Sequence, residues 1–322
     1  VQGIGYGFME RFRNGQRAIE HPGDTLGTSS LLTLVPDQNW GFFVSYNSPA
    51  GSESANELAN ALLDRYAPGQ VGRPVPAGAP VARYAGNYRV NRYPHNDWGK
   101  LQGLMLSVSV TDNGDGSVTM TYPLNLRPAE RLIPVEPLLF RSEDGQHAVA
   151  FAADSRGRIT RMYMPMAVFA AERLAWYESP LLHLGLLGAV ALLSLCTVVG
   201  WPIGALVRRR RDRPALPVQV RTARWLGGVV SGLTLIFLTG LGVFMASALQ
   251  TAVYGTPAWV KPLMLAPLLA SVLTVPLVWA TVRACRVAGW SVWGKLHLGL
   301  MVIAFVPFVG FLWYWNLLGL NA

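Results

Sequence analysis

Cysteine is nearly absent from this chain, which holds only Cys196 and Cys285 in 322 residues. Both lie in or beside long apolar stretches, where a free cysteine usually behaves as a small packing residue. A disulfide framework or a thiolate zinc site would require more cysteines at closer spacing. His95 and His147 have no partner at metal-ligand spacing and are interpreted as surface residues. We therefore predict no metal site and no cofactor.

Acidic residues are almost missing from the second half of the chain. Residues 179–322 hold 11 basic residues but only one acidic residue, Asp212, whereas residues 1–178 hold 16 basic and 17 acidic residues. The net charge of +9 therefore comes from the second half. Because its basic residues flank long apolar stretches, they are typical of membrane orientation, and we predict no binding of nucleic acid.

Four stretches of the second half are long enough to cross a bilayer, which requires about 20 apolar residues in a helix. They run from Leu181 to Val207, Trp225 to Leu249, Pro262 to Val282 and Leu296 to Leu318. They contain no Asp or Glu, and the interior histidine His297 lies near an end, so a channel or transporter is a remote alternative. We predict a four-helix membrane domain that contacts membrane lipid and serves as an anchor or a homo-oligomer interface.

The basic residues also predict how these helices are oriented. The loop between the first two stretches carries seven arginines, and the loop between the last two carries Arg283, Arg286 and Lys295. By the positive-inside rule both loops are cytoplasmic, which places residues 1–178 on the periplasmic or extracellular side of a bacterial inner membrane.

Export of such a domain across the membrane requires a signal sequence. Because the sequence begins at Val1 without an apolar leader, we expect a further segment upstream.

The first 67 residues have the pattern of an antiparallel sheet followed by a helix. Apolar and polar residues alternate over residues 4–12, 17–21, 29–35 and 40–46, with a turn at Asn14 and Gly15. Residues 52–66 place five apolar residues on one helical face: Ala55, Leu58, Ala59, Leu62 and Leu63. A segment this short buries too little apolar surface to stand alone, so it is interpreted as the end of a larger α+β domain.

Several motifs of this region follow a familiar order. They are Gly5-Tyr6-Gly7-Phe8, then His21-Pro22-Gly23-Asp24-Thr25-Leu26-Gly27-Thr28-Ser29-Ser30-Leu31-Leu32, then Pro36-Asp37 and Gly41-Phe42-Phe43-Val44-Ser45-Tyr46-Asn47. In this order they resemble the end of the serine β-lactamase-related fold of class C β-lactamases and penicillin-binding proteins. In that superfamily a Lys-Thr-Gly or His-x-Gly triad lies on the strand beside the active site, and His21-Pro22-Gly23 occupies the matching place.

The resemblance implies catalytic roles for three residues. His21 would hydrogen-bond the nucleophile network or a substrate carboxylate, Gly23 would let substrate approach the strand, and the N–H of Asp24 would be an oxyanion donor. The sequence departs from the family at Pro22, which has no N–H. It also contains no Ser-x-x-Lys nucleophile motif. We therefore expect this chain alone to be inactive.

The middle of the chain is predicted to be a Pro- and Gly-rich linker followed by a β domain. Short strands are expected over residues 86–90, 101–111, 117–122, 131–135, 138–141, 149–153 and 159–164. They predict a small β-barrel or curved sheet. Tyr84-Ala85-Gly86-Asn87-Tyr88 is similar to the start of lipocalin-like domains appended to these hydrolases. Four residues are interpreted as plain core rather than the lining of a ligand cavity: Tyr88, Leu104, Met120 and Phe140.

The predicted fold is therefore multidomain. It comprises a partial α+β serine β-lactamase-like fold (1–67), a linker (68–82), a lipocalin-like antiparallel β-barrel domain (83–178) and a transmembrane domain (179–322). One hypothesis is a membrane-anchored serine hydrolase with an acyl-enzyme mechanism, acting on a small-molecule or peptide substrate. The alternative is a non-catalytic, membrane-anchored ligand-binding or scaffold protein with a degenerate hydrolase domain. An intact Ser-x-x-Lys and Tyr-x-Asn upstream would favour the first.

Overall fold

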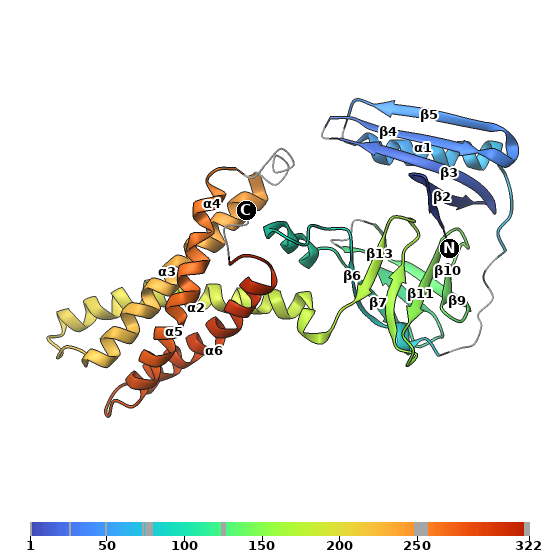
Figure 1. Ribbon diagram of the computed structural model, residues 1–322. Coiled ribbons are helices and arrows are strands. Elements are labelled where there is room, and N and C mark those ends of the chain that lie inside the picture. The colour runs from blue at the N-terminus through green and yellow to red at the C-terminus, as the bar shows by residue number, and fades with distance from the viewer. Residues whose placement is uncertain are drawn as a thin grey trace. The chain divides into compact units, whose positions relative to one another are not determined.

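The structure is a computed structural model, and it describes residues 2–25, 27–48, 50–72, 74, 80–123, 127–247 and 257–318. The chain divides into two compact units (Figure 1). The first comprises Val1–Tyr93 and Gln102–Tyr177, and the second comprises Pro94–Leu101 and Glu178–Ala322. Part of the predicted linker, residues 73 and 75–79, lies outside the described residues.

Five antiparallel strands form the first sheet, in the order β1-β2-β3-β4-β5. They are β1 (Ile4–Gly5), β2 (Phe8–Arg13), β3 (Gln16–Asp24), β4 (Ser29–Val35) and β5 (Trp40–Tyr46). The single strand expected over residues 4–12 is wrong, because Tyr6 and Gly7 have positive φ angles of 51° and 86° and turn the chain between β1 and β2. Asn14 and Gly15 also have positive φ, as a two-residue hairpin requires, which confirms the turn predicted there.

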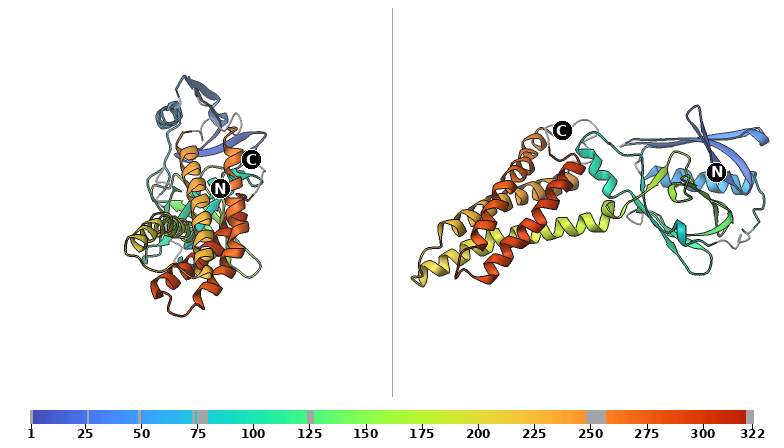
Figure 2. Two further views of the ribbon diagram at one scale, coloured as in Figure 1. Left: turned by 90° about the vertical axis from the view of Figure 1, so that its left-hand side faces the viewer. Right: turned by 60° about the horizontal axis from the view of Figure 1, so that its bottom comes forward.

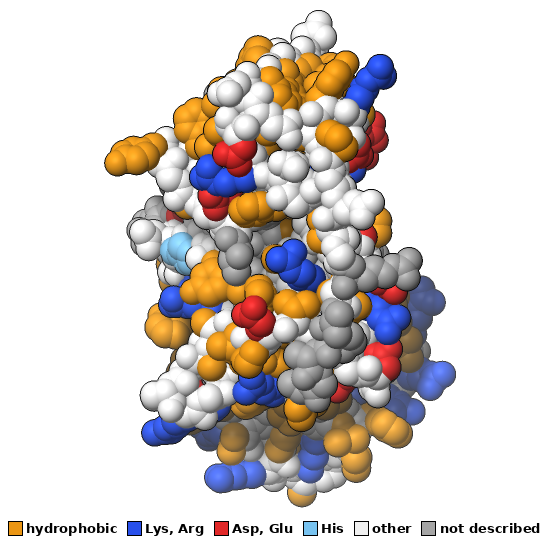
Figure 3. Space-filling model, turned by 90° about the vertical axis from the view of Figure 1, so that its right-hand side faces the viewer, with side chains coloured by type: hydrophobic (Ala, Val, Ile, Leu, Met, Phe, Trp, Pro, Cys, Tyr) orange, Lys and Arg blue, Asp and Glu red, His pale blue; other side chains and the backbone are white. Residues whose placement is uncertain are grey.

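The helix α1 (Gly51–Tyr66) covers one face of this sheet (Figure 1). Two clusters of buried side chains hold the helix to the sheet: Leu31, Ala55 and Ala59 in one, and Ala18, Val35, Leu63 and Ala67 in the other. The opposite face carries exposed apolar side chains, of which Phe43 is 65% exposed. Figure 3 shows hydrophobic side chains gathered in the upper part of the view, at the height of this sheet. The predicted sheet followed by a helix is therefore confirmed.

Eight antiparallel strands form a closed barrel in the rest of this unit (Figure 2). They are β6 (Gly86–Val90), β7 (Ser107–Asp112), β8 (Val118–Thr121), β9 (Glu130–Glu136), β10 (Leu139–Ser142), β11 (Ala148–Ala153), β12 (Ile159–Tyr163) and β13 (Ala170–Arg173). Neighbours in sequence pair with each other, and β13 pairs with β6 to close the barrel. The predicted barrel is confirmed.

Two details of the barrel differ from the sequence prediction. The strand expected over residues 101–111 starts at Ser107 instead, since residues 98–104 form a 3-10 helix. Leu104 therefore lies on that helix and not on a barrel strand. The strand β13 has no counterpart in the prediction, because it is four residues long and buries only Ala171, which gives no alternating signal.

The second unit contains four helices that are long and apolar enough to cross a membrane, as predicted. They are α2 (Pro180–Arg210), α3 (Val218–Ser247), α5 (Leu265–Cys285) and α6 (Val292–Tyr314), and a short helix α4 (Val260–Leu263) precedes α5. Helix α2 packs against α3 and α6, and α5 packs against the same two helices. The segment Pro94–Leu101 belongs to this unit: the ring of Trp98 lies 4.7 Å from the ring of Phe244.

Helix α3 begins at Val218 and not at Trp225, so Arg221 and Arg224 are helical residues and not part of the loop predicted from the sequence. Cys196, which was expected to be a packing residue, is exposed on α2. The start of α3 differs from the prediction because the helix extends into residues too polar to be counted in the apolar stretch.

Two histidines connect α2 with α6, one near the start of α6 and one at its end. Nε2 of His297 lies 2.8 Å from Oγ1 of Thr197. His183 on α2 is buried, and its Nδ1 accepts a hydrogen bond from Nε1 of Trp315 at 3.3 Å. Both contacts hold neighbouring helices together, which is a packing role.

Candidate active-site edge of the sheet

The predicted site residues lie at the end of β3, where one edge of the strand is open. β3 pairs with β4 from Ile19 opposite Leu34 as far as Asp24 opposite Ser29. On its other side the pairing with β2 ends at Met9 opposite Glu20. No strand among the described residues pairs with residues 21–24 on that side. This part of β3 therefore presents main-chain groups without a neighbouring strand.

The ladder also determines which main-chain groups face the open edge. The N–H of Thr25 donates to the carbonyl of Thr28 at 2.8 Å. Because hydrogen-bonded pairs alternate along an antiparallel ladder, the groups of Gly23 and His21 face β4, and those of Pro22 and Asp24 face the open edge. A proline is tolerated there, since its missing N–H would have no partner strand. The N–H of Asp24 is the donor that this edge offers.

The side chains of the three predicted residues do not gather on one face. His21 is exposed on the face opposite α1, where its ring lies 5.9 Å from the ring of Phe8 in an edge-to-face arrangement. Asp24 points to the helix side and accepts a hydrogen bond from Oγ of Ser52 at 3.3 Å. Gly23 lies on the same face as His21, and a Cβ there would meet Oγ of Ser30 at 2.7 Å. The strand places His21 and the Asp24 side chain on opposite faces.

A polar network on the helix side holds β2, β3, β4 and α1 together. Nη1 of Arg11 donates to Oε1 of Glu20 at 2.9 Å, and Oγ1 of Thr33 donates to the same oxygen at 3.1 Å. Arg11 also donates to Oδ1 of Asn60 on α1. This network was not predicted from the sequence, because its four residues come from four separate elements and form no local motif.

A cavity of about 250 Å³ is lined by residues of the sheet and α1 and also by barrel residues such as His147 and Met166. Pro22 and Asp24 line it, together with Arg11, Glu20 and Ser52, whereas His21 and Gly23 do not. Side chains of both charges therefore line the cavity: three arginines (Arg11, Arg13 and Arg127) and three carboxylates (Glu10, Glu20 and Asp24). It is small, its lining is of mixed polarity, and the predicted strand forms part of it.

Glu130 and His147 form a hydrogen bond at one end of the barrel. Nδ1 of His147 lies 2.5 Å from Oε1 of Glu130, and the hydroxyl of Tyr122 donates to Oε2 of Glu130 at 3.0 Å. Burial acts to raise the pKa of Glu130, but the hydrogen bonds from His147 and Tyr122 outweigh it and lower the pKa. Burial and the nearby Glu130 carboxylate raise the pKa of Tyr122. His147, interpreted from the sequence as a surface residue, has a side chain that is 41% exposed and hydrogen-bonds Glu130.

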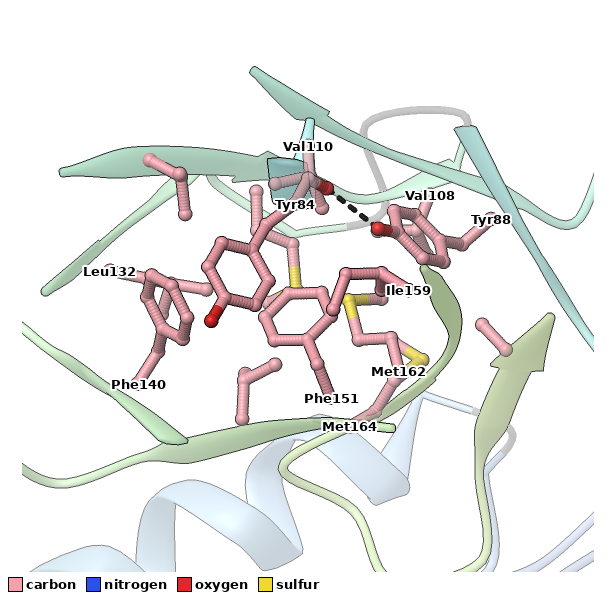
Figure 4. Close-up of a cluster of buried hydrophobic side chains, with 14 of the residues drawn as sticks. Tyr84, Tyr88, Val108, Val110, Leu132, Phe140, Phe151, Ile159, Met162 and Met164 are labelled. Atoms are coloured by element: carbon pink, nitrogen blue, oxygen red, sulfur yellow. Dashed lines mark hydrogen bonds between the residues drawn. The ribbon is translucent and has the colours of Figure 1, made fainter. Parts of the chain in front are cut away.

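The barrel interior is filled by side chains (Figure 4). Tyr84, Phe140 and Phe151 pack together, with ring centroids of Tyr84 and Phe140 4.8 Å apart. The hydroxyl of Tyr88 donates to the carbonyl of Tyr84 at 2.6 Å, and burial raises the pKa of Tyr88 to about 12. The interpretation of Tyr88, Met120 and Phe140 as plain core is confirmed. Within the described residues no group of three His, Cys, Asp or Glu side chains is placed to hold a metal ion.

Comparison with known proteins gives a distant likeness to three solved structures. They are described as the crystal structure of SurE with D-Leu (22% identity, TM-score 0.32), the crystal structure of SurE (23%, 0.31) and the octameric penicillin-binding protein homologue from Pyrococcus abyssi (14%, 0.19). Each match covers 53% of this chain and 39%, 37% and 36% of those chains respectively, so the chain spans about two fifths of their length. No family model and no curated protein matches the sequence.

Proposed function

We propose that this chain is part of a membrane-anchored, extracytoplasmic serine hydrolase that works through an acyl-enzyme. In this proposal the open edge of β3 forms one wall of the pocket, and the nucleophilic serine and its lysine base lie outside these 322 residues. The observation that carries the proposal is the N–H of Asp24, which faces the open edge beside a His-x-Gly triad. The substrate would be an amide or ester of a small molecule or peptide.

The chemistry of acyl transfer explains why such an edge is useful. The serine oxygen attacks the substrate carbonyl while its proton passes to the lysine, and the carbonyl oxygen becomes an oxyanion. A main-chain N–H aimed at that oxygen stabilises it, because the donor is already fixed in place by the strand. The amine or alcohol leaves with the proton, and water then releases the acyl group. Asp24 would supply the N–H donor.

His21 and Pro22 have different roles in this proposal. His21 is exposed on the face away from α1, where its imidazole is available to a substrate carboxylate or to the nucleophile network. Pro22 offers only a carbonyl to the edge, so an extended substrate would find one acceptor at Pro22 and a donor at Asp24. The network of Arg11, Glu20 and Asn60 would keep β3 at a fixed position above the helix.

The proposal also covers how the protein is anchored in the membrane and how its domains are divided. Four helices long and apolar enough to cross a membrane would anchor the protein. Their Arg-rich connections favour an orientation with residues 1–178 on the periplasmic side. We retain 1–67, 68–82, 83–178 and 179–322 as the proposed domains, with a lipocalin-like role for the barrel. Contact with membrane lipid and homo-oligomerisation through the helices are part of the same proposal.

The test is covalent labelling of the full-length membrane protein, including its upstream sequence, with a fluorescent penicillin or fluorophosphonate. Two substitutions of Asp24 distinguish the contribution of its main-chain N–H from that of its side chain. Asp24→Pro removes the N–H, and Asp24→Ala keeps it, so we expect labelling by Asp24→Pro to be about 100-fold slower than by Asp24→Ala. His21→Ala is expected to label more slowly than wild type. Glu57→Gln, on the exposed side of α1, is the control for unaffected labelling.

Two outcomes would contradict the proposal. Equal labelling rates for Asp24→Pro and Asp24→Ala, with both variants folded, would show that this N–H takes no part. An upstream sequence without Ser-x-x-Lys, together with no labelling at all, would favour the non-catalytic alternative, a membrane-anchored ligand-binding or scaffold protein.

A further inference from the structure

A groove of about 810 Å³ lies at the Arg-rich end of the second unit, between α2 and α3. Five arginines line it: Arg208, Arg209, Arg213, Arg221 and Arg224. Its other walls are apolar and include Trp201, Pro202, Leu216, Trp225 and Val229. The same hollow therefore joins a strongly basic region to an apolar one.

The positive charge of this groove is not neutralised by carboxylates. Asp212 is the only acidic residue after Glu178. Over the described ranges of the chain, no ion pair joins any of the five arginines to an acidic side chain. Five like charges around one hollow repel one another, and an anion between them would relieve that repulsion. The groove is electrostatically suited to a negatively charged ligand.

Arg224 shows that the groove is more than a basic loop. It lies within α3, where its Nη2 donates to the carbonyl of Trp201 at 3.3 Å and its guanidinium lies 5.1 Å from the centre of the Trp201 ring. These contacts fix the side chain across the gap between α2 and α3. The remaining N–H groups of a guanidinium can bind a phosphate in a bidentate manner.

We propose that this groove binds an anionic phospholipid, with its phosphate against the arginines and an acyl chain along the apolar wall. The apolar residues continue toward the lipid-facing surface, where Trp225 is 71% exposed. Basic pockets between membrane helices are known to suit such headgroups. The inference rests on these helices lying in a membrane and is independent of the hydrolase proposal. The orientation proposed above places the groove in the cytoplasmic leaflet.

The test uses the full chain purified in a neutral maltoside detergent and titrated with fluorescent phosphatidylglycerol. The test variant is Arg221→Gln with Arg224→Gln. Its matched control is Arg283→Gln with Arg286→Gln, which removes the same charge from the other basic connection. The control is close in chemistry, because Arg283 also lies over an indole ring, that of Trp279, at 4.7 Å. We expect binding to weaken about tenfold or more in the test variant and less than about twofold in the control.

Competition by unlabelled molecules identifies what is recognised. Phosphatidylglycerol is expected to displace the labelled lipid, whereas phosphatidylcholine, which carries no net charge, is expected to compete at least about tenfold less well. Glycerol 3-phosphate shares the phosphate but has no acyl chain. If it competes as well as phosphatidylglycerol, the site binds free phosphate and the lipid assignment is wrong.

The proposal is also overturned if both double variants weaken binding equally, because general surface charge would then explain it. Since Arg224 contacts Trp201, its variant could disturb the packing of α2 on α3. Arg213→Gln avoids this difficulty: it lies outside the helices and lines the groove. Circular dichroism checks folding for each variant. A folded Arg213→Gln protein that binds phosphatidylglycerol as tightly as wild type would contradict the role of the arginine cluster.

Discussion

The barrel and the five-stranded sheet are built from the same kind of hairpins, yet they use them in opposite ways. The barrel closes on itself and fills its interior, so its strands have no free edge and its apolar side chains are buried. The sheet is covered by a helix on one face only, and β3 keeps an open edge beyond Glu20. Closure gives stability, whereas an open edge leaves main-chain donors available for binding.

The largest expected effect is the loss of stability when a buried side chain of the barrel is removed, compared with an exposed side chain of the sheet. Phe140 is fully buried in the barrel, and Phe43 is 65% exposed on the sheet. Phe140→Ala is expected to lower the free energy of unfolding of the barrel by about 3–5 kcal/mol, because it removes buried apolar area and leaves a cavity. Phe43→Ala is expected to change the stability by less than about 0.5 kcal/mol. Hydrogen exchange of the full chain in detergent, read at β9 to β11 and at β4 to β5, measures both.

Similar losses for the two substitutions would contradict the comparison, since they would show that the exposed face of the sheet is covered in the full protein. The control beside the barrel is Met105→Ala, at a residue that precedes β7 and is 47% exposed. It should behave like Phe43→Ala and not like Phe140→Ala.

The next effect concerns Glu130, the partly buried carboxylate at the end of the barrel. Glu130→Gln removes the charge that His147 and Tyr122 hydrogen-bond and is expected to cost about 1–3 kcal/mol at pH 7. Because the pKa of Glu130 is lowered in the folded protein, this stabilisation is present above the ordinary carboxyl pKa and is lost as the pH falls through the lowered value. The difference between wild type and variant in thermal unfolding should therefore shrink in acid. If the difference between wild type and Glu130→Gln grew in acid, Glu130 would be protonated in the folded protein.

A smaller effect is expected for the hydroxyl of Tyr88 inside the barrel. Tyr88→Phe keeps the ring and removes only the hydrogen bond to the carbonyl of Tyr84 (Figure 4). That carbonyl then loses a buried partner, so we expect a cost of about 1 kcal/mol in thermal unfolding. The control is Tyr163→Phe, because Tyr163 at the end of β12 is 39% exposed. No difference between the two would show that water replaces the lost donor.

The alternation of apolar and polar residues was enough to predict most strands, since a strand that buries one face has a period of two. The spacing of apolar residues along one helical face predicted the helix that follows the strands. The prediction from alternation failed where that signal is absent. The four-residue strand β13 buries a single alanine, and Tyr6 and Gly7 interrupt an otherwise regular run by their positive φ angles. Helix ends were also misplaced, because Arg221 and Arg224 extend α3 beyond its apolar part.

The candidate site was less predictable than the fold. A local motif placed His21, Gly23 and Asp24 on one strand, but only the register of β2 and β4 decides which main-chain groups are free. The network of Arg11, Glu20 and Asn60 and the pair of His147 with Glu130 join residues distant in sequence, and neither spacing nor composition predicts such contacts. Contacts between polar side chains of different elements become apparent only in the three-dimensional structure.

The smallest expected effect is that of the ion pair between Arg13 and Asp64, which links β2 to α1. Nε and Nη2 of Arg13 each donate to a different oxygen of Asp64 at 2.6 Å, and Nδ2 of Asn14 donates at 2.8 Å. These hydrogen bonds lower the pKa of Asp64 to about 2, Arg13 contributing most. The Asp64 side chain is 47% exposed, so solvent screens the pair and Asp64→Asn is expected to cost only about 0.5 kcal/mol.

This small contribution has a definite pH dependence. The lowered pKa means that the pair stabilises the fold above the usual carboxyl range and that its contribution is lost as the pH falls from about 4 toward 2. Asp37→Asn, in the turn before β5, is the control for removing a charge from the same sheet. A cost above about 2 kcal/mol for Asp64→Asn alone would show that the pair positions α1 against β2, because an exposed ion pair by itself does not contribute so much. The open edge of β3 would then depend on a contact at the far end of the helix.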